Sequence, residues 1–273
     1  MSQSNKKFNS REKKYSKDNY KSKKTNSFKS RITKKTETKA GMRLNQYIAH
    51  AGISSRREAD KLISAGLVSV NGKVITEMGF RVLPSDSVKF NNETISSEKL
   101  QYLLLNKPKG YLISDDPSKK KIVSELIGQA CKERIYPVGR LDRLSSGLLL
   151  YTNDGELSKK LTNTKQRVKK IFHITLDKNL KHADMINMID NIGSQKFYLD
   201  IQKMSYVQNA TKKELGLEIN KGKNKSIVEM FGSLGYKVLK LDRVYFGGLT
   251  KKDIPRGRFR FLNEQEVSML KMI

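Results

Sequence analysis

Cysteine is nearly absent from this chain, and long apolar runs are absent altogether. Cys131 is the only cysteine among 273 residues, so neither a disulfide framework nor a cysteine-rich zinc site can form within the chain. No apolar run approaches the roughly 18 residues that a membrane span needs, and the first residues lack the apolar core of a signal peptide. The histidines His50, His173 and His182 are too dispersed to suggest a metal site. These absences predict a soluble cytoplasmic protein without a metal centre.

Acidic residues are too few to balance the basic ones. Lys and Arg number 55 against 27 Asp and Glu, which gives a formal net charge of +28 and a pI near 10.0. Such a surface attracts a polyanion, and nucleic acid is the first candidate. Binding to anionic lipid would need an amphipathic helix or a lipid anchor, and the N-terminal segment has neither. We therefore expect a nucleic acid, and no membrane, as the partner.

The start of the chain is strongly basic. Residues 1–41 hold 14 Lys and Arg against three acidic residues, with Ser, Asn and Thr between them and only scattered apolar side chains. Such a segment buries too little apolar surface to offset its ordering entropy, so we expect a disordered basic tail. The tail is either an electrostatic tether for RNA phosphates or simply a solvated segment.

A small α+β module is predicted directly after this tail. Apolar residues spaced i, i+3, i+4 and i+7 from Leu44 predict a short helix that ends at Gly52. Ser55 and Glu58 have the spacing of a capping box, and they open a second helix that ends at Gly66. The polarity then alternates around an Asn-Gly pair, which predicts a β-hairpin with a type I′ turn.

Arg56 and Arg57 lie in the first turn of the second helix, where the helix dipole makes positive charge unfavourable. A bound phosphate would compensate for them, and two solvated side chains are the alternative. The order of two helices with an early Arg-Arg and then a hairpin with Val-Asn-Gly, seen in residues 42–59 and 66–73, resembles the alpha-L RNA-binding domain of the ribosomal-protein-S4 type. The resemblance covers roughly residues 42–90, within a domain expected at residues 42–98. It implies RNA contacts for Arg56, Arg57 and Lys73, without implying a reaction.

A second domain is predicted at residues 101–270. Apolar runs of strand length alternate with Gly, Pro and charged loops, and helical stretches lie between them. The segments around residues 102–106, 147–151, 172–176 and 237–241 are expected strands, and residues 122–130 an expected short helix. Because no regular βαβ repeat is visible, the pattern favours the α+β class over a doubly wound sheet.

The most informative segment of this second domain runs from Tyr136 to Gly155. Asp142 lies there in an expected turn before a buried strand, which would hold its carboxylate rigidly at the edge of a sheet, as a nucleophile requires. Arg140 and Arg143 flank it and would keep the carboxylate ionised. From spacing alone, a loop or salt-bridge carboxylate is the alternative interpretation.

Gly-Arg-Leu-Asp142, followed by Ser-x-Gly-Leu-Leu-Leu and Thr-Asn-Asp-Gly155, resembles the active-site signature of pseudouridine synthases that modify ribosomal RNA and carry an alpha-L domain in front, the RsuA-like family. The segment from Leu103 to Gly110 is similar to the strand that opens the catalytic domain of this family. The family's catalytic domain has a mixed, largely antiparallel sheet. The resemblance covers residues 42 to about 268.

This resemblance implies a site and a reaction. Asp142 would be the nucleophile that lets uracil detach from ribose, rotate and rejoin through carbon, and no metal or organic cofactor would be needed. A uracil inside a helix cannot be reached, so the target nucleotide would be flipped into the pocket. Arg140 would displace or brace that nucleotide.

Two positions depart from the family pattern. Phe172 occupies the place of a tyrosine; its ring can stack on uracil but has no hydroxyl group, and an ordinary core aromatic is the alternative. Val228 occupies the place of the basic residue that pairs with the catalytic aspartate, and Glu229 follows it. Lys225 or Arg140 would then have to supply the missing charge.

The sequence thus leads to a ribosomal RNA pseudouridine synthase. Its expected partner is ribosomal RNA or a pre-ribosomal particle, and the protein is expected to act as a monomer. The alternative is a catalytically impaired RNA-binding or ribosome-assembly protein on the same scaffold, motivated by Val228 and Glu229. A nonspecific DNA or membrane binder would rest on charge alone.

Overall fold

The computed structural model describes residues 41–273, except Ser97, Asp115, Pro117, Gln129 and residues 193–195. The basic tail expected at residues 1–41 therefore lies outside the described part of the chain, apart from Gly41.

Two helices and two small sheets form the N-terminal module. Helix α1 (Leu44–His50) and helix α2 (Arg56–Ser64) pack against a four-stranded sheet of order β3-β2-β5-β6, and β1 pairs with β4. The strands of the module are β1 (Met42–Arg43), β2 (Val68–Val70), β3 (Lys73–Val74), β4 (Arg81–Val82), β5 (Val88–Phe90) and β6 (Glu93–Thr94). Its apolar core is formed by Leu44, Ile48, Ala59, Ile63, Val68, Val70, Ile75, Val82 and Val88.

The local signals of this module are confirmed. The Ser55 side chain accepts the Glu58 N–H at 3.3 Å, and the Glu58 carboxylate accepts the Ser55 N–H at 2.8 Å, which completes the capping box. Gly52 and Gly66 have φ values of +74° and +73°, as expected where helices end. The Asn-Gly turn has positive φ at both residues, as a type I′ turn requires.

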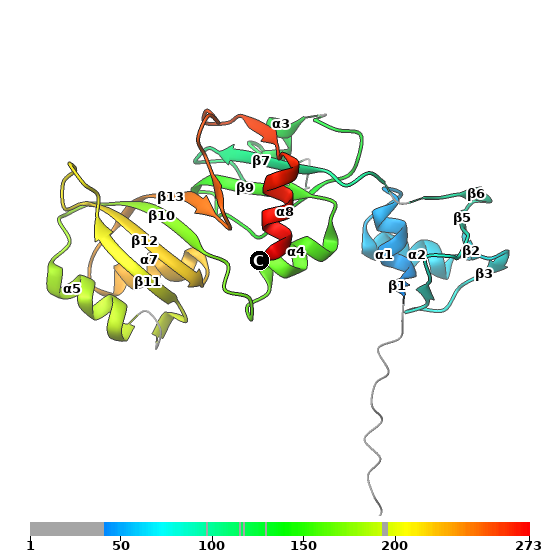
Figure 1. Ribbon diagram of the computed structural model, residues 1–273, viewed down its shortest axis with the longest axis horizontal. Coiled ribbons are helices and arrows are strands. Elements are labelled where there is room, and N and C mark those ends of the chain that lie inside the picture. Colours follow the sequence, from blue (N-terminus) through cyan, green and yellow to red (C-terminus); the bar gives the residue numbers. More distant parts are fainter. Residues whose placement is uncertain (1–40, 97, 115, 117, 129, 193–195) are drawn as a thin grey trace, which may run out of the picture. The chain divides into compact units, whose positions relative to one another are not determined.

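A mixed nine-stranded sheet forms the second domain, with the main order β11-β12-β10-β13-β9-β7-β15 (Figure 1). Strand β8 pairs with β9, and β14 with β13. Only the β9–β13 pair is parallel among the described strands, so the expected α+β class and the largely antiparallel sheet are confirmed. The strands are β7 (Tyr102–Lys107), β8 (Tyr136–Pro137), β9 (Ser146–Thr152), β10 (Lys170–Leu176), β11 (Asp200–Tyr206), β12 (Glu214–Lys221), β13 (Val238–Phe246), β14 (Leu249–Thr250) and β15 (Phe259–Phe261).

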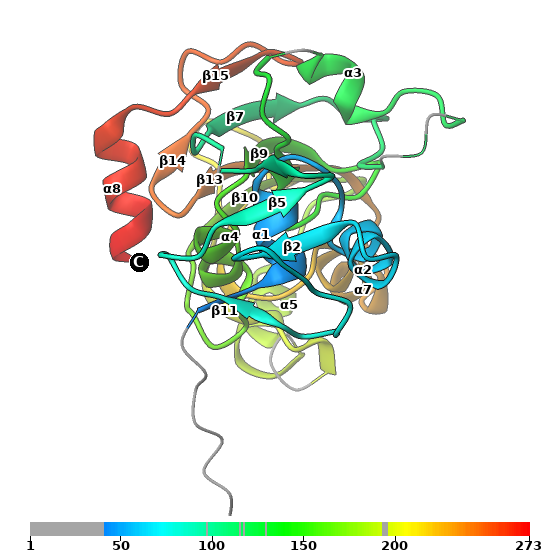
Figure 2. The same cartoon turned by 90° about the vertical axis from the view of Figure 1, so that its right-hand side faces the viewer.

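Helices cover this sheet in separate groups (Figures 1 and 2). Helices α4 (Gly155–Thr162) and α8 (Glu264–Met272) pack on one face of β7 and β9, and α3 (Val123–Ile127) packs on the other. Helix α7 (Asn224–Ser233), with α5 (His182–Asn187) and the π-helix η1 (Met188–Ile192), packs on β10 and β12. Because β7 and β9 are buried on both faces, their sequences are continuous apolar runs.

Among the described strands, the two halves of the sheet pair with each other through β9 and β13, and Phe246 of β13 also packs on Leu148 and Leu150 of β9. Strands β9 and β13 pair in parallel at two positions, Asp242 with Ser146 and Arg243 with Gly147. One half consists of β11, β12, β10 and β13 with α7, and the other of β9, β7 and β15 with α3, α4 and α8. We call the four paired residues the parallel seam.

Candidate active site

The loop that carries Asp142 leads directly into β9. This strand is flanked by β7 and β13, so the loop enters the start of a central strand rather than lying at the edge of the sheet as we expected. Leu141 is 3% exposed and packs in the core under α3, whereas the Asp142 side chain is exposed. The backbone is therefore anchored while the carboxylate remains accessible.

A buried lysine holds this loop. Lys107, at the end of β7, is 0% exposed, and its Nζ donates to the carbonyl oxygens of Asp142 at 3.1 Å, Ser145 at 2.8 Å and Pro108 at 3.2 Å. Burial lowers the pKa of Lys107 to about 8, and the negative charge of Asp142 opposes this shift only in part. Three carbonyl groups thus use all three N–H groups of the ammonium ion.

The turn after β7 makes a second attachment to the loop. The Gly110 N–H donates to the carbonyl oxygen of Arg143 at 2.7 Å, and the Arg143 Nε donates to the carbonyl oxygen of Gly110 at 3.1 Å. Together with Lys107, these bonds fix the backbone on both sides of Asp142. A rigid support of this kind is what a nucleophilic side chain requires.

Helix α7 begins next to the same loop. The Asn224 side chain donates to the carbonyl oxygen of Arg140 at 3.3 Å, so the two halves of the sheet meet at the segment that carries Asp142. The site is therefore assembled from both sides of the parallel seam.

Val228 replaces the basic partner of Asp142, and we expected Lys225 or Arg140 to supply that charge instead. Neither side chain forms an ion pair with Asp142 among the described residues. Lys225 forms an ion pair with Glu229 at 3.4 Å, and Val228 is 42% exposed on the same helix. Within the described residues, no basic side chain lies within 4.0 Å of the Asp142 carboxylate. Lys107 is the cation whose charge interacts with Asp142, although its hydrogen bond reaches the backbone.

The expectation for Phe172 is corrected. Its side chain is 0% exposed and belongs to the apolar core that α7 forms with β10 and β12. The structure therefore supports the alternative of a core aromatic, because no ring surface is open for a base to stack on.

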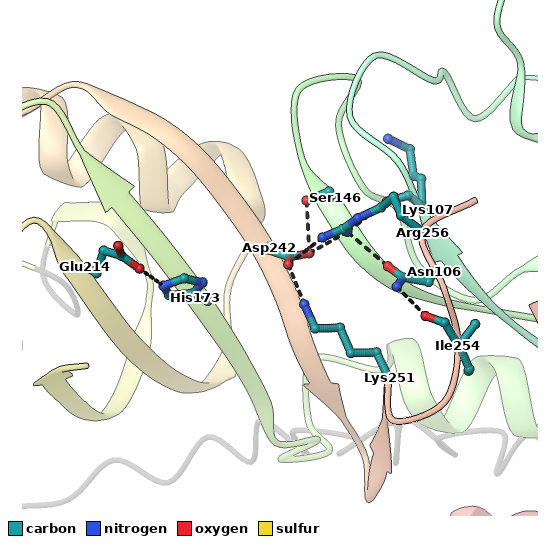
Figure 3. A network of polar contacts seen from close by, with 9 residues as sticks. All are labelled: Asn106, Lys107, Ser146, His173, Glu214, Asp242, Lys251, Ile254 and Arg256. Carbon is teal, nitrogen blue, oxygen red and sulfur yellow. Dashed lines mark hydrogen bonds and ion pairs between the residues drawn. The ribbon is translucent and has the colours of Figure 1, made fainter. Parts of the chain in front are cut away.

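Sequence reasoning missed a buried polar network at the parallel seam (Figure 3). Asp242 is 0% exposed, and its carboxylate accepts hydrogen bonds from Ser146 Oγ at 2.9 Å, Lys251 Nζ at 2.7 Å and both terminal nitrogens of Arg256 at 3.0 Å. Burial alone would raise the pKa of Asp242, but Arg256 and Lys251 outweigh burial and hold that pKa well below its usual range. Arg256 also donates to Asn106 on β7 at 3.0 Å.

The RNA-binding residues expected in the N-terminal module are at its surface. Arg56 and Arg57 are exposed in the first turn of α2, and Lys73 is exposed in β3. These side chains are therefore accessible to a polyanion, and their contacts to RNA remain a prediction.

Comparisons with known proteins agree with this two-domain arrangement. Residues 42–88 match the S4 domain family, and residues 101–233 match the RNA pseudouridylate synthase family. The ribosomal large subunit pseudouridine synthase B of Bacillus subtilis is 35% identical over 236 residues, which are 85% of this chain and 96% of that protein. The dual-specificity RNA pseudouridine synthase RluF of Escherichia coli K12 is 31% identical over 241 residues, which are 86% of this chain and 80% of that protein.

A solved structure gives the same result. The crystal structure of a pseudouridylate synthase superposes with a TM-score of 0.56 at 26% identity, over 84% of this chain and all of that chain. The fold and the Asp142 loop thus define an RNA-modifying isomerase with an S4 domain. The chain belongs to the RNA pseudouridine synthase family, and it converts uridine to pseudouridine in RNA.

The expected family and reaction are therefore confirmed, and no finding favours a catalytically impaired binder. Among the residues that the structure describes, no helix is long and apolar enough to cross a membrane.

Proposed function

We propose that this protein isomerises specific uridines of large-subunit ribosomal RNA, with Asp142 as the nucleophile. The observation that carries the proposal is an exposed carboxylate on a loop whose backbone is fixed by the buried ammonium group of Lys107. Fixed geometry before the reaction contributes to catalysis because the reacting groups need not be ordered during it.

In the proposed reaction, the bond between N1 of uracil and C1′ of ribose breaks, and a bond between C5 and C1′ forms. The hydrogen on C5 leaves as a proton, and N1 gains a proton, so atoms and charge balance. The Asp142 carboxylate forms a bond to C1′ as the N1–C1′ bond breaks, and this bond breaks again when C5 attacks C1′, which restores the carboxylate. The protein's own residues supply this chemistry, since a carboxylate nucleophile divides one difficult substitution into two easier steps.

RNA binding in this proposal involves both domains. Arg140 is exposed beside Asp142 and braces the flipped nucleotide, and Lys225 contributes positive charge at the start of α7. Arg56, Arg57 and Lys73 contact the phosphate backbone. Flipping is required because a stacked uracil cannot reach Asp142.

The large subunit is proposed because the Bacillus subtilis relative is named for it. We further propose that the protein acts in the cytoplasm as a monomer on ribosomal RNA or a pre-ribosomal particle. One copy of the chain already carries the exposed Asp142 site, so a second copy is not needed to complete it.

The test is to incubate the protein with unmodified transcripts of both ribosomal RNAs, and with immature particles, and to map pseudouridines chemically. The Asp142→Asn variant serves as the matched control because it keeps the shape of the side chain. We expect new sites in large-subunit RNA with the unchanged protein only. Modification confined to small-subunit RNA would contradict the substrate, and full modification by Asp142→Asn would contradict the nucleophile.

A further inference from the structure

The parallel seam is a short strand pairing, and it lies between the two parts of the active site. Strands β9 and β13 pair at only two described positions, with one further bond from Arg243 Nε to the carbonyl oxygen of Leu148 at 2.8 Å. The Asp142 loop lies on one side of this seam and α7 lies on the other. Any shift at the seam would change the distance between α7 and the loop. Because parallel pairing is slightly less stable per residue than antiparallel pairing, additional bonds help so short a parallel contact to stay in register.

Asp242 supplies those bonds from the centre of the seam. Its carboxylate on β13 accepts the hydroxyl hydrogen of Ser146 on β9, four residues after Asp142. Ser145, the preceding residue, is held through its carbonyl oxygen by Lys107. Two successive residues at the base of the Asp142 loop are therefore fixed by two different buried charged groups.

The same carboxylate also ties the seam to β7. Arg256 donates to both oxygens of Asp242, to the side-chain oxygen of Asn106 at 3.0 Å and to the carbonyl oxygen of Lys107 at 3.4 Å (Figure 3). Asn106 in turn donates to the carbonyl oxygen of Ile254 at 2.8 Å. One buried negative charge thus connects β13, β9 and β7 with the segment that follows β14.

We propose that Asp242 is a positioning residue for the isomerisation, because it fixes the parallel seam across which the active site is assembled. This proposal rests on the function proposed for Asp142. Asp242 does not touch the substrate and acts through Ser146 and the register of β9 against β13.

A variant that neutralises Asp242 is expected to fold, because its two cationic partners are partly exposed to water. The side chains of Lys251 and Arg256 are 33% and 39% exposed, so water can solvate both cations when Asp242 becomes neutral. Asp242→Asn keeps the size of the side chain but weakens its bonds to both cations. Ser146→Ala removes one hydroxyl group and leaves the carboxylate with its cations.

The experiment measures single-turnover rates at saturating RNA, at a temperature where every variant is fully folded, together with RNA affinity. We expect Asp242→Asn to lower the rate by on the order of 10²-fold, because small misplacements of reacting groups have effects of that size. RNA affinity should be unchanged. Ser146→Ala should lower the rate less, and the double variant should be no slower than Asp242→Asn, because Ser146 and Asp242 act through the same hydrogen bond.

Glu266→Gln is the matched control, since it weakens another two-contact ion pair, the one with Arg260 in β15, at 2.6 and 2.7 Å. It should lower the unfolding temperature without changing the single-turnover rate. Unchanged rates in Asp242→Asn and Ser146→Ala would overturn the proposal, and Ser146→Ala alone decides if Asp242→Asn does not fold. Failure of the proposed function would appear separately, as no product from the unchanged protein or full product from Asp142→Asn.

Discussion

Lys107 places an ammonium group at the base of the active-site loop, where its N–H groups bond to three backbone carbonyl oxygens. A buried lysine without a carboxylate partner is costly, and its lowered pKa of about 8 reflects that cost. The arrangement makes the loop sensitive to the protonation of one side chain.

We expect the single-turnover rate to decline as the pH rises above about 8, the pKa of Lys107. The neutral amine keeps only two N–H groups, so one carbonyl of the loop loses its donor. The unfolded chain binds more protons between this pKa and the ordinary lysine value of about 10.4, so the contribution of Lys107 to stability rises with pH in that window.

The measurement is a pH profile of the single-turnover rate beside a pH profile of urea unfolding. Activity and the Lys107 contribution to stability should move in opposite directions. Lys107→Met is the control and should be slow at every pH, without the alkaline decline. The same decline in Lys107→Met would show that another group causes it.

The important residues of the site differ in how visible they are in the sequence. Asp142 is visible because a long motif surrounds it, whereas Lys107 and Asp242 are single charged residues inside or at the end of strands. Pattern reasoning treats such residues as solvated, and their roles depend on distant partners: Ser145 lies 38 residues from Lys107, and Ser146 lies 96 residues from Asp242. Phe172 was misjudged for a related reason, since a sequence does not say which face of a strand α7 covers.

At the scale of elements, Gly147 determines how closely β9 and β13 approach. Its φ is +105°, and a Cβ atom there would lie 2.6 Å from the backbone nitrogen of Arg243 and 2.7 Å from Asp242 Oδ1. A side chain at this position would therefore push the parallel seam apart, and the left-handed φ would add strain.

We expect Gly147→Ala to lower the free energy of unfolding by more than about 3 kcal/mol, which is large for a single substitution. Gly139→Ala is a matched control in the same motif, because its φ is +73° and no atom lies within 4 Å of its added Cβ. That variant should lose only the roughly 1–2 kcal/mol of left-handed strain. Urea unfolding measures both, and equal losses would contradict the close approach at the seam.

Most elements could be predicted because their signals are local. The capping box, the Asn-Gly turn and the apolar strands each depend on residues within one segment. The parallel pairing of β9 with β13 could not be predicted, because its partners are 96 residues apart and only two pairs define it. The predicted helix at residues 122–130 is shorter in the structure, α3 ending at Ile127 before Gly128 with its positive φ.

At the scale of the whole molecule, the net charge of +28 makes binding to RNA sensitive to salt. Arg56 and Arg57 are exposed at the start of α2, where we expect phosphate contacts. The surplus charge itself predicts affinity for any polyanion, so the contribution of these two side chains has to be separated from it.

We expect Arg56→Gln and Arg57→Gln each to reduce the slope of log affinity against log salt by about 1, as loss of one phosphate contact does. Lys61→Gln is the control, because Lys61 is an exposed cation in the last turn of the same helix. Its slope should stay close to that of the unchanged protein. A slope that falls equally in all three variants would indicate general charge attraction instead of contacts at the start of α2.

Asp142 is proposed to carry out the exchange of the N1–C1′ bond for a C5–C1′ bond. Ribosomal RNA labelled with tritium at C5 of uridine tests it most directly, because formation of the new bond releases that hydrogen to water. We expect tritium release by the unchanged protein under single-turnover conditions and none by Asp142→Asn, although both bind the RNA equally. Release by Asp142→Asn at the rate of the unchanged protein would show that Asp142 is not the nucleophile.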